Sequence, residues 1–227
     1  PRECEAVITV PASEVDDVLA FVGECEQVWR DEFATIEDGL SFTAERVELP
    51  KMMVPDEIRD NLVDAIFACP NGVERFIPTI PDTVETSSNL AIVEIGNGKA
   101  AIKVLTRSSR ESMKDYRNTA IESCFSMAGM QVVRSGGYSG WEPDVNSPIL
   151  HAMKESYKAQ FGEIPSVKVI HAGLECGIIG AVGPGLDMIS FGPTLQCPHT
   201  PEERCLIPSV TKFYEFLIAT LENTPLK

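Results

Sequence analysis

The fold is decided by a stretch that reads Val-Lys-Val-Ile-His-Ala-Gly-Leu-Glu-Cys-Gly at residues 167–177 and Asp-Met-Ile-Ser-Phe-Gly-Pro at residues 187–193. A third run, Gln-Cys-Pro-His-Thr-Pro-Glu-Glu, follows at residues 196–203. Two short apolar runs of β type each lead into a turn that is bounded by glycine or proline and carries a histidine. An α/β sheet presents reactive groups in this way at the carboxyl ends of its strands. We therefore expect the functional site here.

Composition narrows the class of protein. The 227 residues, 44% hydrophobic and 23% charged, are typical of a soluble globular protein with one large domain or two modest ones. The net charge of −15 argues against a surface for nucleic acid or for an anionic membrane, because both need clustered Lys and Arg. We therefore expect a small molecule or a protein as the partner.

The sequence contains no signal for the membrane or for export, which predicts the cellular location. It has no apolar run of membrane-spanning length and no signal peptide of basic-then-apolar layout at its start. Its seven cysteines form no Cys-x-x-Cys pair, which fits reduced thiols and a cytoplasmic location. The chain begins at Pro1 rather than at a methionine, so we expect it to be part of a longer protein.

Residues 1–136 predict one domain of alternating strands and helices. Strands are expected at 6–10 and 41–49, separated by an amphipathic helix with apolar residues at three- and four-residue spacing. A second helix near 58–67 precedes a hairpin around Gly96-Asn97-Gly98, a third helix and a strand at 130–134. This order predicts an α/β (α+β) fold, namely a ferredoxin-like domain with an added helix, whose sheet has one free face.

A glycine-rich connector at 135–143 predicts the boundary with a second segment, residues 137–227. This segment is expected to contain a helix at 148–161, strands at 167–170 and 186–191 with a short helix between them, and a final helix. Two parallel-type strands with their helices cannot bury both faces of a sheet. The segment is therefore expected to be the C-terminal part of a larger α/β domain.

Three residues of the opening stretch are candidates for chemistry. His199 follows an apolar run and lies between two prolines, where a neutral imidazole can be held for a metal ion or a proton. A solvated surface histidine is the simpler interpretation of the spacing alone. His171 and Glu175 flank a glycine at a turn from strand to helix, where Glu175 can equally be a favourable acid in the first helical turn.

Two further candidates belong to the predicted hairpin. Arg107 ends a strand, and its guanidinium can form two parallel hydrogen bonds with a carboxylate. The alternative is an exposed arginine that balances an acidic chain. Asn89 can donate an amide hydrogen bond to a ligand, although polar residues are common on the open face of a sheet. The residues alone leave both alternatives open.

The order of the three motifs makes the chain recognisable. Residues 169–177, 186–194 and 198–203 closely resemble the aminoacyl-histidine dipeptidases, dinuclear-zinc peptidases related to carnosinase and aminoacylase. The likeness extends to Arg-Ser-Ser at 107–109 and Trp-Glu-Pro-Asp at 141–144, so it covers nearly the whole chain. It implies that 1–136 is most of a lid or dimerisation domain and that 137–227 is the C-terminal portion of a zinc-peptidase catalytic domain.

The resemblance also implies roles for residues. His199 matches a zinc ligand, and Arg107 matches the lid arginine that holds the substrate carboxylate. Gly173 and Glu175 match the turn that lines the pocket, and Asn89 and His171 are looser candidates for substrate binding. The implied activity is hydrolysis of unblocked Xaa-His dipeptides by a zinc-activated water, in a homodimer formed through the lid sheet.

The family's His-x-Asp motif, its bridging aspartate and its Glu-Glu base precede the lid, and the chain contains none of them. A zinc ion needs three or four protein ligands. We therefore expect one ligand here for the two zinc ions of a complete protein, no catalytic residue, and an inactive chain when alone. A second hypothesis, from a different class, is a non-catalytic binding or dimerisation module that retains the peptidase lid fold.

Overall fold

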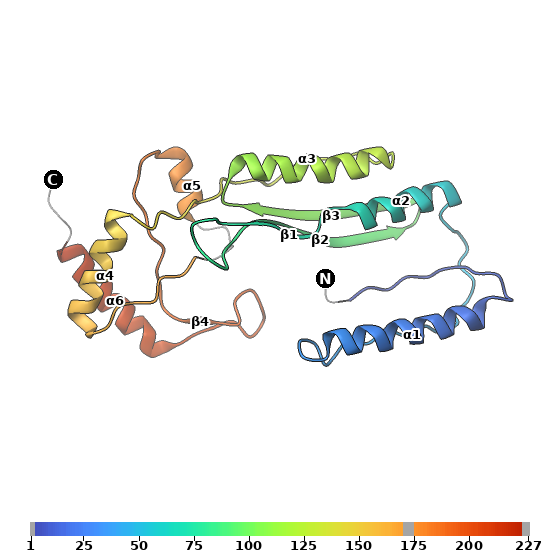
Figure 1. Cartoon of the computed structure of the whole chain (residues 1–227), viewed down its shortest axis with the longest axis horizontal. Helices are drawn as coiled ribbons and strands as arrows, with labels where there is room; N and C mark the ends of the chain where they lie inside the picture. The colour runs from blue at the N-terminus through green and yellow to red at the C-terminus, as the bar shows by residue number, and fades with distance from the viewer. Residues whose placement is uncertain (1–2, 170–174, 224–227) are drawn as a thin grey trace. The chain divides into compact units, whose positions relative to one another are not determined.

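A computed structural model of the chain describes residues 3–169 and 175–223 (Figure 1). The backbone groups into two compact units, which divide between Arg59 and Asp60. The described residues form six helices and five strands. Within these residues, no helix combines the length and the apolar character that crossing a bilayer requires.

The first unit is built on helix α1 (Val15–Phe33), which confirms the predicted amphipathic helix. The strands expected at 6–10 and 41–49 are not formed, so these predictions are wrong. A backbone segment becomes a strand only when its N–H and C=O groups pair with a neighbouring strand. None of residues 3–59 is buried. Within the unit, the apolar runs at 6–10 and 41–49 therefore have neither a partner strand nor a buried core against which to pack.

The second unit contains an antiparallel sheet of order β1-β2-β3, made of β1 (Gly72–Phe76), β2 (Val84–Gly96) and β3 (Lys99–Ser108). The β2–β3 hairpin is confirmed where it was predicted. Its turn residues Asn97 and Gly98 have φ of 52° and 72°, as a two-residue type I′ turn requires. β1 was not predicted, because its five residues are all exposed and show no alternation of apolar and polar positions.

Helices α2 (Asp56–Ala68) and α3 (Glu111–Met127) cover one face of this sheet (Figure 1), as predicted. The core between helices and sheet is formed by Ala65, Cys69, Ile121 and Phe125, against which Ile66, Leu90, Ile102, Val104, Ala128, Met130 and Val132 pack. The mixed α/β fold class is thus confirmed. The strand expected at 130–134 is not formed, because this segment pairs with no other strand among the described residues. Arg134 instead donates hydrogen bonds to Glu122 and Thr119 of α3.

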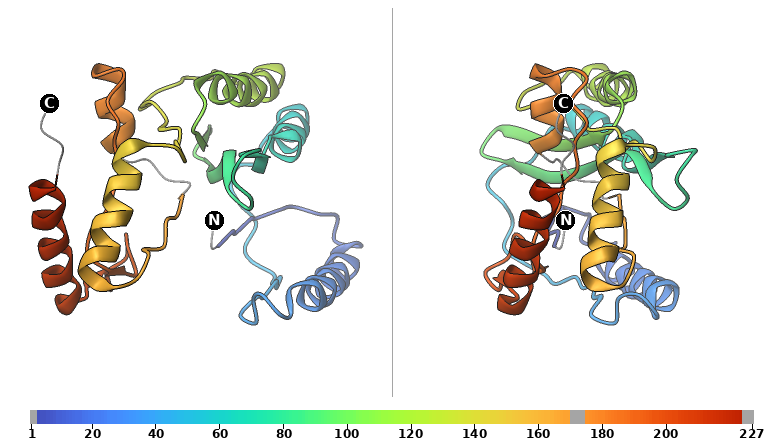
Figure 2. Two further views of the ribbon diagram at one scale, coloured as in Figure 1. Left: turned by 60° about the vertical axis from the view of Figure 1, so that its left-hand side comes forward. Right: turned by 90° about the vertical axis from the view of Figure 1, so that its left-hand side faces the viewer.

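Beyond the connector, α4 (Pro148–Phe161) and α6 (Ile207–Glu222) lie side by side (Figure 2). Tyr157 packs edge-on against Phe216 with ring centroids 5.1 Å apart, and the Lys212 ammonium lies 4.7 Å from the centroid of the Phe161 ring. α4 matches its prediction: Ser147 caps its start by accepting the Leu150 N–H, and Gly162 ends it with a φ of 76°.

The strands expected at 167–170 and 186–191 are not formed in the part of these ranges that the structure describes. Parallel-type strands need paired neighbours on their edges and helices on both faces. Asp187 instead fixes its segment to α4, because it accepts hydrogen bonds from the Ser147 hydroxyl (2.6 Å) and the Ile149 N–H (2.8 Å). The remaining elements are α5 (Glu175–Val182) and a small ladder of β4 (Leu195–Gln196) with β5 (Arg204–Cys205).

Candidate functional site

Two of the predicted substrate-binding residues share one face of the sheet. The register pairs Leu90 with Val104, and both pack against the helices. Side chains alternate between faces along a strand. The next pair in the ladder, Asn89 with Leu105, therefore projects from the opposite, open face, and so does Arg107 two residues further on. Asn89 and Arg107 are both exposed and occupy diagonal positions, which lie about 7–8 Å apart in antiparallel sheets.

Buried polar contacts fix the end of the strand that carries Arg107. The hydroxyls of Thr86 and Ser108 lie 2.9 Å apart and are buried between sheet and helix. The Ser108 hydroxyl also accepts the N–H of Arg110 at 3.0 Å. Beside them, buried Glu85 accepts from the Arg75 guanidinium at 2.8 Å. The backbone at Arg107 is therefore held on a rigid element, as a binding residue requires.

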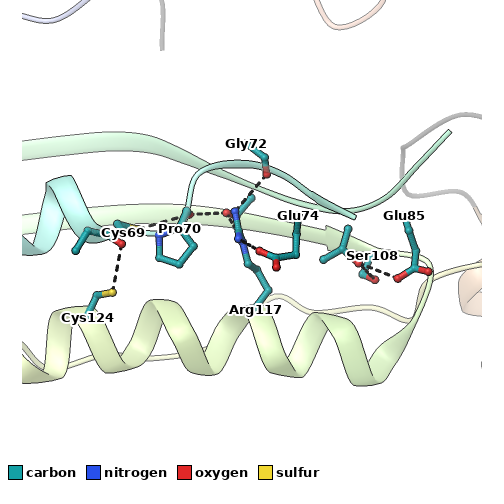
Figure 3. A network of polar contacts seen from close by, with 11 residues as sticks. Cys69, Pro70, Gly72, Glu74, Glu85, Ser108, Arg117 and Cys124 are labelled. Atoms are coloured by element: carbon teal, nitrogen blue, oxygen red, sulfur yellow. Dashed lines mark hydrogen bonds and ion pairs between the residues drawn. The ribbon is translucent and has the colours of Figure 1, made fainter. Parts of the chain in front are cut away.

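Arg117 supports the same sheet from α3 (Figure 3). Its buried guanidinium donates to the Ser88 hydroxyl at 2.9 Å and the Gly72 carbonyl at 3.3 Å, and it forms an ion pair with Glu74. A buried charge is tolerated only when it is paired in this way. Sequence reasoning missed Arg117, because a buried arginine has no signal in a pattern of apolar spacing.

Two close backbone contacts join the end of β3 to helix α5. A Cβ added at Gly140 would lie 2.3 Å from the Ser108 carbonyl oxygen, and one added at Gly177 would lie 2.3 Å from the Ser139 carbonyl oxygen. The connector thus passes between the sheet and α5, whose first residue is Glu175. Sequence reasoning missed both glycines. For Gly177 the available signal was its place inside a helix, where glycine is unfavourable unless packing needs it, whereas Gly140 lies in the connector and has no such signal.

A carboxylate at the start of α3 holds this connector. Glu111 accepts the N–H of Gly140 at 2.9 Å and a hydrogen bond from the Lys114 ammonium at 2.8 Å. Lys114 also donates to the Tyr138 carbonyl at 2.8 Å. The hydrogen bond from Lys114 lowers the pKa of the Glu111 carboxyl below its ordinary value.

A cavity of about 1040 Å³ lies along β3 and α3 and is lined by Arg107, Trp141 and Val169, among others. Val169 is the last described residue before the 170–174 segment. His171 and Gly173, two of the predicted pocket residues, lie outside the described residues. Glu175 is exposed at the first position of α5, so both interpretations of it stay open.

His199 lies in the loop that the β4–β5 ladder closes. Its φ of 64° is left-handed, which is uncommon for a residue other than glycine, and its N–H donates to Glu203 Oε2 at 2.7 Å. The side chain is exposed. The final helix α6 begins only at Ile207, and the Glu203 carboxylate accepts a hydrogen bond within this loop instead.

The residues that the structure describes do not form a zinc site by themselves. Across 3–169 and 175–223, no three or more His, Cys, Asp and Glu side chains are grouped so that they could hold a metal ion. A second cavity of about 310 Å³ is lined by α4, Phe216 and residues 165–169 and 188–191. Neither cavity is lined by His199, Glu175 or Asn89. The structure therefore groups Asn89 with Arg107 but leaves His199 apart from both cavities.

No family model matches the chain. Over all 227 residues it is 36% identical to the "Cytosol non-specific dipeptidase" of Escherichia coli (strain K12), of which it covers 47%. Its structure is similar to the crystal structure of aminoacylhistidine dipeptidase from Vibrio alginolyticus, with a TM-score of 0.84 and 32% identity over 96% of this chain and 44% of that one. Aminopeptidase PepT from Bacillus cereus ATCC 10987 shares the fold, with a TM-score of 0.58 and 19% identity over 73% of this chain and 44% of that one.

These similarities match the chain, over 96% or more of its length, to two dipeptidases. More narrowly, the predicted resemblance to the aminoacyl-histidine dipeptidases is confirmed, and the chain aligns with part of a dipeptidase of the PepD type. It spans about half the length of the relatives that it matches.

Proposed function

We propose that the chain supplies the lid, residues 1–136, and the C-terminal catalytic portion, residues 137–227, of a dipeptidase that hydrolyses unblocked Xaa-His dipeptides. The observation that carries the proposal is the placement of Asn89 and Arg107 on one open sheet face. Support for the reaction class comes from the name of the E. coli relative, a dipeptidase.

The roles of the residues follow from their chemistry. The Arg107 guanidinium has the fork geometry that matches the terminal carboxylate of a dipeptide. The Asn89 amide, on the same face, donates to the substrate near its peptide carbonyl. Glu175 offers a negative charge for the substrate amine. Gly173 and His171 are proposed to line the pocket next to it.

A metal role is proposed for His199 alone. Zinc, when bound in a peptidase, lowers the pKa of a water so that it can attack an amide carbonyl. The described residues provide one imidazole and no group of three ligands, so the other ligands of the two proposed zinc ions have to come from outside these residues.

The test of the Arg107 role uses a chimaera that joins the chain to the part of the E. coli dipeptidase outside the aligned region. Arg107→Ala should raise KM for a Xaa-His dipeptide about 10–100-fold, the value of one charged hydrogen bond, and should leave KM for the amidated dipeptide unchanged. Arg110→Ala, an exposed arginine paired with Glu142 at the same end of the sheet, is the matched control. Equal KM values for Arg107→Ala and Arg110→Ala would refute the role.

The test of the His199 role measures zinc stoichiometry in the same chimaera. His199→Ala should lose up to one zinc ion per chain and most of the turnover. His151→Ala, an exposed histidine on α4, should retain both and is the control. Full zinc content in the His199 variant would show that the imidazole is not a ligand.

We also propose a homodimer through the open face of the lid sheet and a cytoplasmic location. Ile92 and Leu105 are apolar and exposed on that face, 39% and 51% respectively, which supports a protein contact there. The word "cytosol" in the name of the E. coli relative supports the location. Sedimentation of the chain as a monomer at all concentrations, unchanged in Leu105→Lys, would reject this interface.

The alternative of a non-catalytic module is favoured by one observation, the lack of a three-ligand group among the described residues. The chimaera decides between the two. Zinc-dependent hydrolysis that Arg107→Ala impairs supports the dipeptidase. A zinc-loaded but inactive chimaera that still dimerises supports the module.

A further inference from the structure

The chain contains two Asn-Gly dipeptides, Asn71-Gly72 and Asn97-Gly98. In such a pair the glycine nitrogen is not hindered by a side chain of its own and can attack the asparagine Cγ. The new N–Cγ bond closes a five-membered imide, the Cγ–Nδ2 bond breaks, and Nδ2 leaves as ammonia with the proton of the glycine amide. Water then opens the imide on one side to aspartate or on the other side to isoaspartate. The reaction therefore needs no co-reactant other than water.

The structure holds the first of these dipeptides in place. Although Asn71 is exposed, its Oδ1 accepts the Leu90 N–H at 2.8 Å. Gly72 is the first residue of β1 and pairs with Ser88, and its carbonyl accepts from Arg117 at 3.3 Å. Ser88 and Arg117 are both buried. Ring closure at Asn71 therefore has to break a side-chain hydrogen bond and disturb a buried polar network.

The second dipeptide has no such contacts. Asn97 is exposed in the hairpin turn, and within residues 3–169 and 175–223 no hydrogen bond holds its side-chain amide. A Cβ added at Gly98 would meet no atom within 4 Å, so the space beside the attacking nitrogen is open. The β2–β3 ladder ends at the pair of Gly96 with Lys99, and both turn residues lie outside it.

The imide at Asn97 forms from an opened turn. Rotation about the Cα–C bond of Asn97 has to bring its Cγ to the Gly98 nitrogen, and the type I′ geometry, with a φ of 52° at Asn97, is left in this step. All residues at 92–101 are exposed. Local opening costs least where few buried contacts are lost. The tip of the hairpin can therefore open while the rest of the sheet stays paired.

We propose that Asn97 is a modification site at which the folded chain deamidates to aspartate and isoaspartate, while the structure protects Asn71. Aspartate adds one negative charge to a chain whose net charge is already −15. Isoaspartate adds a methylene group to the main chain, which a two-residue type I′ turn cannot hold, so the end of the ladder unpairs. The proposal goes beyond the reaction proposed above and does not depend on catalytic activity.

The experiment incubates the full chain at pH 8 and maps its peptides over time by mass spectrometry, with separation of the aspartate and isoaspartate forms. In the folded chain, conversion at Asn97 should be at least about 10-fold faster than at Asn71, because opening at Asn97 exposes no buried residue. In concentrated urea the difference should vanish, since both dipeptides have the same nucleophile. Asn97→Gln is the control, because its longer side chain cannot form the five-membered imide. It should stop conversion at residue 97 and leave the rate at Asn71 unchanged.

Three outcomes would overturn the proposal. The first is conversion at Asn71 that is as fast as conversion at Asn97 in the folded chain. The second is an Asn97 that stays intact in the folded chain, which would show that the turn does not open. The third is an equally large excess of conversion at Asn97 in urea, which would assign the difference to neighbouring residues in the sequence and not to the fold. Every readout is a peptide mass, so a failed dipeptidase assay would leave the proposal standing.

Discussion

Residues 3–59 and the sheet-helix layer of residues 60–132 have similar sequence patterns, but only the second region forms a sheet and a buried core. Each combines an amphipathic helix with apolar runs of β type. α3 buries Ile121 and Phe125, whereas α1 buries no residue and leaves Phe33 41% exposed. A helix satisfies its own backbone, while a strand and a core need a second element. The comparison separates what a sequence pattern encodes locally from what depends on a partner.

The largest expected effect comes from a substitution in the core of the sheet-helix layer, residues 60–132. Phe125→Ala removes an aromatic ring that is 5% exposed and should lower the free energy of unfolding by about 3–4 kcal/mol. Phe33→Ala, at the end of the exposed α1, should cost less than about 1 kcal/mol. Urea unfolding followed at Trp141 for the second unit and at Trp29 for the first measures each variant. Equal costs would mean that α1 has a core contact in solution.

The next effect compares two arginine–carboxylate pairs. Arg117→Ala leaves Glu74 and Ser88 without their buried partner and should destabilise the second unit by about 3 kcal/mol. The pair of Arg46 with Asp16 in the first unit is largely exposed, so Arg46→Ala should cost at most about 0.5 kcal/mol. The same urea experiment tests both variants. A cost below 1 kcal/mol for Arg117→Ala would show that water reaches the network.

A smaller effect tests the contact between connector and sheet. Gly140→Ala would force a Cβ against the Ser108 carbonyl and should cost about 1–3 kcal/mol. Gly137→Ala, three residues earlier, meets no atom within 4 Å and should change stability by less than about 0.5 kcal/mol. Thermal unfolding of the two variants gives the comparison directly. If both behave alike, the connector is not held against β3 in solution.

The sequence could predict the elements that carry their own signal. The hairpin was placed by its Gly-Asn-Gly turn, and the helix at 148–161 was predicted with the bounds that the structure gives α4. The five strands that were expected without a turn signal between them are not formed in the described residues, because the sequence of a strand does not specify which strand it pairs with. The same division holds for the site. The face shared by Asn89 and Arg107 follows from hairpin register, while Arg117, Gly140 and Gly177 depend on contacts between segments far apart in sequence.

The smallest effect is a pH dependence of the connector contact at Glu111. Because its pKa is lower in the folded chain than the ordinary 4.5, the ionised carboxylate stabilises the fold above about pH 4.5, and this contribution is lost as the pH falls through the folded value. The side chain is 56% exposed, so solvent screening limits the effect to about 0.5 kcal/mol. Exchange of the Gly140 amide should therefore be slower in the wild type than in Glu111→Gln at pH 6, and the difference should shrink as the pH falls below 4.5 and the carboxylate is protonated. Equal exchange rates in the wild type and Glu111→Gln at pH 6 would show that a neutral side chain holds the connector equally well.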